Sequence, residues 1–239
     1  MAYSEKIVMS IGGSLIVPDE GIDTKFLSNL NAFIRKQLAR SAGSGQAPTK
    51  QFFLVAGGGK LARDYRDAGA KVTGHELTAE DLDWLGIHST RLNAHLLRTI
   101  FRDVAHPTII ENFETIRKPI EQVVVAAGWK PGHSTDYDSV LICEDYHVRR
   151  IVNLSNIDKV YNKDPKKFKD AKSIDKISWI EFRKLVGDKW IPGLNAPFDP
   201  VASQKAQELG VKVAVLSGHN FENLGNYLEG KEFVGTVIE

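Results

Sequence analysis

The sequence predicts an α/β fold, in which helices cover both faces of a mainly parallel β-sheet. Short runs of β-branched and other apolar residues alternate along the chain with amphipathic stretches, the order that βαβ units produce. Most of these apolar runs are continuous, as in strands that are buried on both faces of a sheet. The chain has 239 residues, 42% of them hydrophobic, which suffices for a single domain over residues 1–239.

Seven segments have the length and composition of strands. In chain order they are Lys6–Ile11, Gln51–Ala56, Pro107–Glu111, Gln122–Ala127, Arg150–Leu154, Val211–Leu216 and Glu232–Ile238. Ligands of open parallel sheets bind beyond the carboxyl ends of the strands. Functional residues are therefore expected in the loops that directly follow these segments.

Three helices are predicted from apolar periodicity and from capping residues. In Thr24–Arg40 the apolar side chains fall on one helical stripe. Thr78–Val104 opens with a capping box, because Asp81 lies three residues after Thr78. Asp199–Gly210 begins with an N-capping carboxylate and ends at a glycine.

The charge balance and the cysteine count exclude several classes of protein. The 31 Lys and Arg residues nearly balance the 30 Asp and Glu residues, and this argues against a polybasic nucleic-acid binder. No apolar run approaches the roughly 18 residues of a membrane span, and the N-terminal residues lack a signal-peptide pattern. The single cysteine, Cys143, excludes an internal disulfide, so a reducing, cytoplasmic compartment is expected.

Two glycine-rich loops follow the first two predicted strands. In Gly12–Ser14, paired glycines allow backbone N–H groups to approach an anion closely. Gly57–Gly59 leads into a helix with Lys60 and Arg63 in its first turn, where N–H groups also point at an anion. Two cations there oppose the helix dipole unless an anion binds. The second loop is therefore predicted to bind phosphate. The first loop, taken alone, is explained equally well as an anion-binding loop or as a tight turn.

Neither loop has the sequence of a common nucleotide-binding motif. Lys60 is followed by leucine rather than by Ser or Thr, so the Walker A motif is absent, and no Gly-x-Gly-x-x-Gly opens a helix. The protein-kinase catalytic set is also absent. These absences argue against P-loop NTPases, Rossmann dehydrogenases and protein kinases.

Two further loops place polar and aromatic residues at strand ends. Gly128–Asp136 offers glycine backbone, the Trp129 ring, a cation, hydroxyls and a carboxylate, which suits a ligand with a flat ring and an anionic end. Core packing of Trp129 and helix capping by Asp136 are the alternatives for these two residues. Asn153–Lys167 follows a buried strand with polar residues, and its Tyr161 is suited to pack against a base.

These motifs, in this order, resemble the amino acid kinase superfamily. They are Gly-Gly-Ser at 12–14, Gly-Gly-Gly-Lys-Leu-Ala-Arg at 57–63, Pro-Gly-His-Ser-Thr-Asp at 131–136 and Asn-Ile-Asp-Lys-Val-Tyr-Asn-Lys-Asp-Pro-Lys-Lys at 156–167. Within the superfamily the chain is most similar to archaeal-type UMP kinases, over essentially its whole length. The resemblance implies a three-layer αβα sandwich with about eight mostly parallel strands, and phosphoryl transfer from ATP·Mg²⁺ to UMP.

The resemblance also implies roles for individual residues, with UMP held mainly by residues 1–150 and ATP mainly by residues 151–239. The residues implied to bind ATP are Gly12, Gly13, Ser14, Gly59, Arg63, Ser155, Asn156, Tyr161 and Asp164. The residues implied to bind UMP are Gly58, Asp83, Trp129, Lys130, Pro131, Gly132, His133, Ser134 and Thr135. Catalytic roles fall to Arg63, Asp136 and Lys60. Mg²⁺ would be held through the ATP phosphates rather than by a protein metal site.

The chain departs from the UMP kinase pattern at several places of the site, and one of them is Pro192–Pro200, where a serine-rich segment is expected before the Asp-Pro pair. Bacterial UMP kinases have a lysine where Ser10 stands, and Lys60, Lys130 or Lys163 would supply that positive charge here. Trp129 and Lys130 replace a threonine and a histidine, and the strand-end position of Trp129 predicts that its indole stacks on the pyrimidine.

Two other functions are consistent with much of this sequence pattern. One is a superfamily kinase with another acceptor, such as an amino acid carboxylate, and the other is a nucleotide-binding storage or regulatory protein. The Pro-Gly-His-Ser-Thr-Asp loop favours UMP over a carboxylate acceptor. The presence of Arg63, Asp136 and Asp164 favours catalysis over storage.

An oligomer is also predicted. The helix Thr78–Val104 carries apolar residues on more than one face, so it is expected to be buried on several sides. UMP kinases that resemble this chain are hexamers built from dimers. The resemblance therefore implies a homohexamer, with this helix at the dimer contact.

Overall fold

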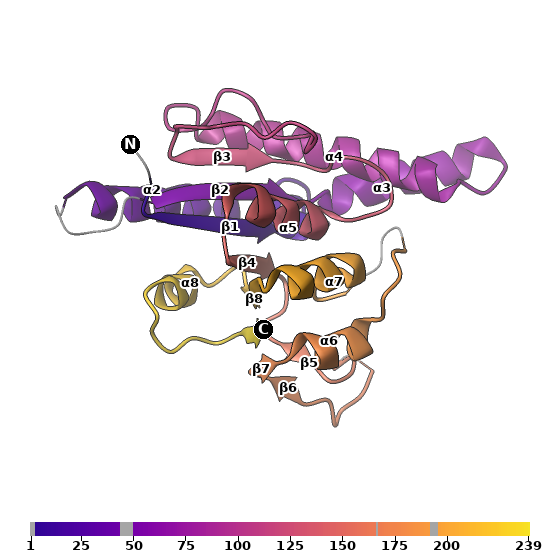
Figure 1. Cartoon of the computed structure of the whole chain (residues 1–239). Helices are drawn as coiled ribbons and strands as arrows, with labels where there is room; N and C mark the ends of the chain where they lie inside the picture. The colour runs from indigo at the N-terminus through magenta and orange to yellow at the C-terminus, as the bar shows by residue number, and fades with distance from the viewer. Residues whose placement is uncertain (1–2, 44–49, 166, 192–195) are drawn as a thin grey trace.

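The computed structural model describes residues 3–43, 50–165, 167–191 and 196–239. A central sheet lies between two layers of helices, which confirms the predicted three-layer αβα architecture (Figure 1). In chain order the elements are β1 (Glu5–Ile11), α1 (Gly13–Ile16), α2 (Thr24–Gly43), β2 (Lys50–Ala56), α3 (Gly59–Thr73), α4 (Ala79–Ile100), β3 (Val123–Ala126), α5 (Thr135–Tyr146), β4 (Arg150–Ser155), β5 (Val160–Tyr161), β6 (Ser173–Ile174), β7 (Lys176–Ile177), α6 (Trp179–Val186), α7 (Pro200–Leu209), β8 (Lys212–Ser217), α8 (Phe221–Leu228) and β9 (Thr236–Ile238).

The main sheet has seven strands in the order β3-β2-β1-β4-β8-β9-β7. Five neighbouring strands, from β3 to β8, are all parallel, and β9 runs antiparallel to β8. The chain builds outward from β1 in both directions, to β2 and β3 on one side and to β4 and β8 on the other. The strand order therefore reverses at β1, and such a switch point opens a crevice for ligands at the carboxyl ends of the strands.

The alternation of side chains along the strands divides the core between the two faces. In β1, Ile7 and Met9 pack with the buried side chains of α2, α4 and α8 on one face. Val8 lies in the opposite cluster, with the buried side chains of α5, α6 and α7. All three β1 residues are completely buried, because helices cover both faces.

One predicted strand does not form. Near Pro107–Glu111 only two isolated bridges reach β3, from Ala105 to Val123 and from Ile110 to Ala126. Proline has no N–H to donate to a β-ladder, and the segment covers the edge of β3 without regular pairing. The apolar composition of this segment therefore reflects burial at the sheet edge rather than a strand.

Other boundaries also differ from the predictions. The helix predicted over Thr78–Val104 ends at Ile100, and the strand predicted over Glu232–Ile238 is confined to Thr236–Ile238. The two-residue strands β5, β6 and β7 and the short helices α1, α6 and α8 were not predicted, because elements of this length show little periodicity.

The predicted helix caps are confirmed. The Thr78 hydroxyl accepts from the N–H of Asp81, whose carboxylate accepts from the Thr78 N–H in return. Asp199 Oδ1 accepts from the Ala202 N–H, and Gly210 ends α7 in the left-handed conformation. Within the described ranges, none of the helices combines the length and apolar character that crossing a bilayer requires.

Candidate active site

A cavity of about 660 Å³ lies at the carboxyl ends of β1, β2, β3 and β4, where the switch point predicts a ligand site. Its lining includes Gly12, Gly57, Gly128 and Ser155, each of which is the last residue of a strand or lies within two residues of its end. This volume suits one or two small ligands. The strand ends thus bring all four predicted loops to one edge of the sheet, although not every residue of those loops faces the cavity.

The two glycine loops touch each other and form one wall of the cavity. The Gly57 N–H donates to the carbonyl of Ile11 over 2.9 Å, and the Lys60 N–H donates to the carbonyl of Val17 over 2.8 Å. A Cβ on Gly13 would lie 2.0 Å from the Gly59 nitrogen, so the loops approach too closely for any side chain. Gly59 has a φ of +64°, which other residues rarely adopt, and no side chain of the N-cap residue Gly58 caps the start of its helix α3.

The carboxylate of Asp136 lies at the opposite wall. Its Oδ1 accepts from the Ser10 hydroxyl over 2.8 Å, and its Oδ2 accepts from the Asp199 N–H over 3.1 Å. Burial raises the pKa of Asp136 to about 7, and the neighbouring Asp199 carboxylate adds to the shift. Ser134 caps α5, so Asp136 is not the N-cap of this helix and is available to the cavity.

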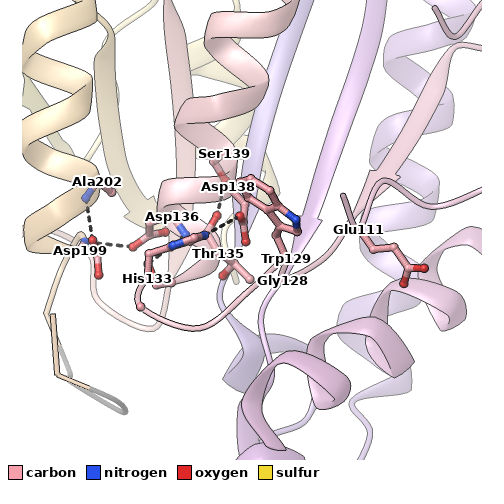
Figure 2. A network of polar contacts seen from close by, with 12 residues as sticks. Glu111, Gly128, Trp129, His133, Thr135, Asp136, Asp138, Ser139, Asp199 and Ala202 are labelled. Atoms are coloured by element: carbon pink, nitrogen blue, oxygen red, sulfur yellow. Dashed lines mark hydrogen bonds and ion pairs between the residues drawn. The ribbon is translucent and has the colours of Figure 1, made fainter. Parts of the chain in front are cut away.

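His133 and Asp138 form a second polar pair beside Asp136, as the dashed lines in Figure 2 show. His133 Nε2 lies 3.2 Å from Asp138 Oδ1, and Asp138 is almost completely buried. Burial raises the pKa of the Asp138 carboxyl, while His133 opposes this shift. The pair fixes the start of α5, which carries Thr135 and Asp136 into the cavity.

Helix α4 holds the loop that follows β3. The N–H of Gly132 donates to Asp83 Oδ2 over 2.8 Å, and the N–H of Gly128 donates to the Thr90 hydroxyl over the same distance. Arg91 Nε donates to the Gly128 carbonyl over 3.1 Å. Asp83 and Thr90 are both buried and both line the cavity, so one helix holds this loop at its start and at Gly132.

Comparison with known proteins identifies the family. The family model "Amino acid kinase family" matches residues 5–217. The chain belongs to the amino acid kinase family. It is 30% identical to a uridylate kinase of Methanobrevibacter smithii, over 98% of each chain, and 35% identical to a uridylate kinase of Thermoplasma volcanium, over 99% of this chain and 98% of that one. The solved uridylate kinase of Archaeoglobus fulgidus has a TM-score of 0.78 at 29% identity, covering 98% of this chain and all of that one.

The cavity of this amino acid kinase brings together most of the residues predicted from the sequence. The predicted site residues on its lining are Gly12, Gly13, Ser14, Gly58, Gly59, Arg63, Asp83, His133, Ser134, Thr135, Asp136, Ser155 and Asn156. The predicted site residues that do not line it are Lys60, Trp129, Lys130, Pro131, Gly132, Tyr161 and Asp164. Within the segment that runs from Pro192 to Pro200, residues 192–195 lie outside the described residues.

The cations of the cavity differ from those expected. Lys60 Nζ lies 2.6 Å from Asp64 Oδ1, one turn along α3, and Lys60 is not part of the cavity lining. Arg63 lines the cavity, although its side chain is 49% exposed and donates to Asp19 over 2.8 Å. Arg66, on the next turn of α3, also lines the cavity and was not predicted.

The other two lysines considered as replacements at Ser10 lie elsewhere. Lys130 Nζ sits 3.8 Å from the centre of the Trp129 ring, and Lys163 pairs with Asp170 over 2.6 Å. None of the three lysines lies on the cavity lining, and the hypothesis that one of them supplies the positive charge absent at Ser10 stays a prediction.

The tryptophan that faces the cavity is Trp190 rather than Trp129. The Trp129 ring packs against Phe113, with ring centres 5.8 Å apart, and against His133 at 6.2 Å. Trp190 lines the cavity and donates its indole N–H to Asp83 Oδ2 over 3.2 Å. No sequence signal separated these two tryptophans, since the difference depends on which way each loop turns.

The sequence did contain one pattern that points to the role of α4 in holding the site loops, namely polar residues on the buried stripe of this helix. Asp83, Thr90 and Asn93 recur at helical spacing on a face that is otherwise apolar, and all three are buried. Asn93 donates to the Gly57 carbonyl over 2.8 Å. Because buried polar groups need partners, such a stripe predicts a helix that holds loops in place.

We predict that Gly13→Ala lowers stability by about 1–3 kcal/mol and weakens phosphate binding, because the new methyl group meets backbone atoms that cannot yield. Gly21→Ala is the matched control for added bulk, since no atom lies within 4 Å of a Cβ there, although its φ of +109° adds some strain of its own. Chemical denaturation and ATP titration of both variants check this. Gly13→Ala with unchanged stability and ATP affinity would contradict the contact.

Proposed function

We propose that this amino acid kinase is a uridylate kinase, which transfers the γ-phosphoryl group of ATP to UMP and releases ADP and UDP. The observation that carries this proposal is one cavity whose lining combines the two glycine loops, Asp83 and the loop after β3. Full-length identity of about 30% or more to several uridylate kinases supports the same acceptor. A cytoplasmic location is proposed from the single, unpaired thiol.

Two anions have to be aligned for this reaction, and the chain provides separate places for them. Ser155 and Asn156, at the end of β4, would receive ATP, while Asp83 and His133 lie on the side proposed for UMP. Residues 151–239 thus form mainly the ATP side and residues 1–150 mainly the acceptor side. Phosphoryl transfer needs little covalent chemistry from the protein, so backbone N–H groups and Arg63 would stabilise the charge on the moving group.

Magnesium fits the carboxylates at this end of the cavity. Asp199 Oδ2 is buried and has no hydrogen-bond partner among the described residues, and it lies beside the like-charged Asp136. No group of three or more metal-ligating side chains occurs in the described ranges, so the ATP phosphates would supply the remaining ligands. Bound there, Mg²⁺ would neutralise charge on the phosphates.

The test of the proposed function is ADP formation with a panel of acceptors. UMP, CMP, AMP, GMP, glutamate and carbamate are compared at equal concentration, with ATP and Mg²⁺. We expect UMP to give the highest kcat/KM. Faster turnover of another acceptor would assign a different kinase of this family, and ATP binding without any turnover would favour a storage or regulatory protein.

Stacking of Trp129 on the pyrimidine stays a prediction. If it occurs, Trp129→Ala weakens UMP binding about tenfold, which corresponds to about 1.4 kcal/mol. Its packing against Phe113 favours the alternative, in which the same substitution lowers the melting temperature and leaves UMP affinity unchanged. Calorimetric Kd values for UMP beside melting curves separate these two outcomes.

The homohexamer built from dimers also stays a prediction. Helix α4 exposes Trp84 and Leu92, the latter by 60%, and α3 beside it exposes Tyr65 and Val72. Large exposed apolar side chains on neighbouring helices are typical of a protein–protein contact. Light scattering at micromolar concentration should give the mass of six chains, and a monomer would contradict the prediction.

A further inference from the structure

Trp190 links the two sides of the proposed active site. It follows α6, and in Figure 1 the chain beyond α6 rises from the lower part of the molecule toward the level of α3 and α4. Its indole N–H donates to Asp83 Oδ2 across 107 positions of sequence. Trp190 is half-buried and Asp83 is buried, and both line the cavity.

The hydrogen bonds to Asp83 leave one of its oxygens available. An ionised carboxylate offers about four lone-pair sites, two on each oxygen. Asp83 Oδ2 accepts from the Gly132 N–H over 2.8 Å and from the Trp190 indole over 3.2 Å, so both of its sites are used. Among the described residues no hydrogen bond reaches Oδ1. Two acceptor sites therefore remain, on one oxygen of a buried carboxylate at the cavity wall.

A cation completes this corner of the cavity. Arg66 Nε donates to the Leu82 carbonyl over 2.9 Å, and its guanidinium interacts electrostatically with Asp83. Gly86 makes room for this group, since a Cβ there would lie 2.4 Å from an Arg66 terminal nitrogen. The carboxylate is thus surrounded by groups that favour its charge and restrict its rotation.

The resemblance to UMP kinases implies that Asp83 holds UMP through the ribose hydroxyls, and Oδ1 still has acceptor sites for both of them. We propose that Trp190 is a positioning residue, which fixes the Asp83 carboxylate so that Oδ1 stays turned toward these hydroxyls. The kinase would then select ribonucleotides over deoxyribonucleotides. This inference rests on the proposed function, because it takes the sugar of the acceptor nucleotide to lie at Asp83.

The test is the ratio of kcat/KM for UMP to kcat/KM for 2′-deoxy-UMP. We expect the unmodified protein to prefer UMP by about tenfold or more, the effect of one hydrogen bond to a charged group. In Trp190→Phe the ring remains but the N–H donor is lost, so the carboxylate can rotate. We expect the preference to fall to about threefold or less.

Trp84→Phe is the matched control. Trp84 lies on α4 one residue from Asp83, and its indole N–H also donates to a carboxylate, Glu80 Oε1, over 3.3 Å. Trp84 does not line the cavity, so its loss should leave the UMP preference unchanged. A merely structural role of Trp190 would lower stability or kcat without changing the ratio of the two substrates.

Three results would overturn the inference. They are equal use of UMP and 2′-deoxy-UMP by the unmodified protein, an unchanged ratio in Trp190→Phe, and an equal change of the ratio in Trp84→Phe. The first of these results needs only the unmodified protein, so it can be obtained even if Trp190→Phe does not fold. A different result would contradict the proposed function itself, namely that neither UMP nor 2′-deoxy-UMP is phosphorylated.

Discussion

Asp136→Asn is expected to lower kcat about 10³-fold while it raises the stability of the protein above neutral pH. The catalytic effect follows from the position of Asp136 at the cavity wall, where Ser10 and the backbone of Asp199 hold both of its oxygens in place. A preorganised group that acts on the transferring phosphoryl and its cations contributes about 10²–10³ in rate. Single-turnover measurements of ADP formation check this part of the prediction.

The stability effect has the opposite sign and depends on pH. The pKa of Asp136 is about 7 in the folded protein, against 3.8 for an unperturbed carboxyl. The folded protein therefore holds this proton more tightly than the unfolded chain, and stability is lost as pH rises from about 4 to about 7. The difference between these two pKa values corresponds to a loss of stability of up to about 4 kcal/mol at pH 8. The neutral amide of Asn removes this cost.

Melting curves at pH 5 and pH 8 measure the effect. We expect Asp136→Asn to melt above the unmodified protein at pH 8, with a smaller difference at pH 5. Asp188→Asn is the control, because Asp188 is an exposed carboxylate and its loss should not give this pH dependence. A variant that keeps normal turnover, or one that is less stable than the unmodified protein at pH 8, would contradict the assignment.

Arg63→Ala is expected to lower kcat by about 10²-fold or more with little loss of stability. One donor to developing negative charge contributes about 2.7–4 kcal/mol to transition-state stabilisation. The Arg63 side chain is half-exposed, and its contacts with Asp19 and Ser14 lie at the surface, so the fold does not depend on it. Steady-state kinetics and a melting curve test the two halves of this prediction.

Lys60→Ala provides the comparison for Arg63. Lys60 is the other predicted catalytic cation of α3, but it pairs with Asp64 and does not line the cavity. We expect a much smaller loss of kcat from Lys60→Ala than from Arg63→Ala. Equal losses would mean that Lys60 turns toward the phosphates when ATP binds, and normal turnover by Arg63→Ala would refute its role.

The sequence by itself determined the architecture and the side of the site that is predicted to bind phosphate. Continuous apolar runs specified the buried strands, and each glycine loop followed a strand end, so Gly12–Ser14 and Gly57–Gly59 could be placed at one edge of the sheet. The caps at Thr78 and Asp199 were equally predictable, because a cap depends on residues three positions apart. These features depend on residues that are close together in the sequence, so a sequence pattern is enough to predict them.

Only the tertiary structure decided which side chains face the ligand. Asp136 and Asp199 are 63 residues apart and meet because α5 and α7 pack on the same face of the sheet. Trp190, and not Trp129, reaches the cavity, because the chain after α6 returns toward Asp83. Composition cannot distinguish such residues, since the direction of a side chain depends on the packing of elements far away in the sequence.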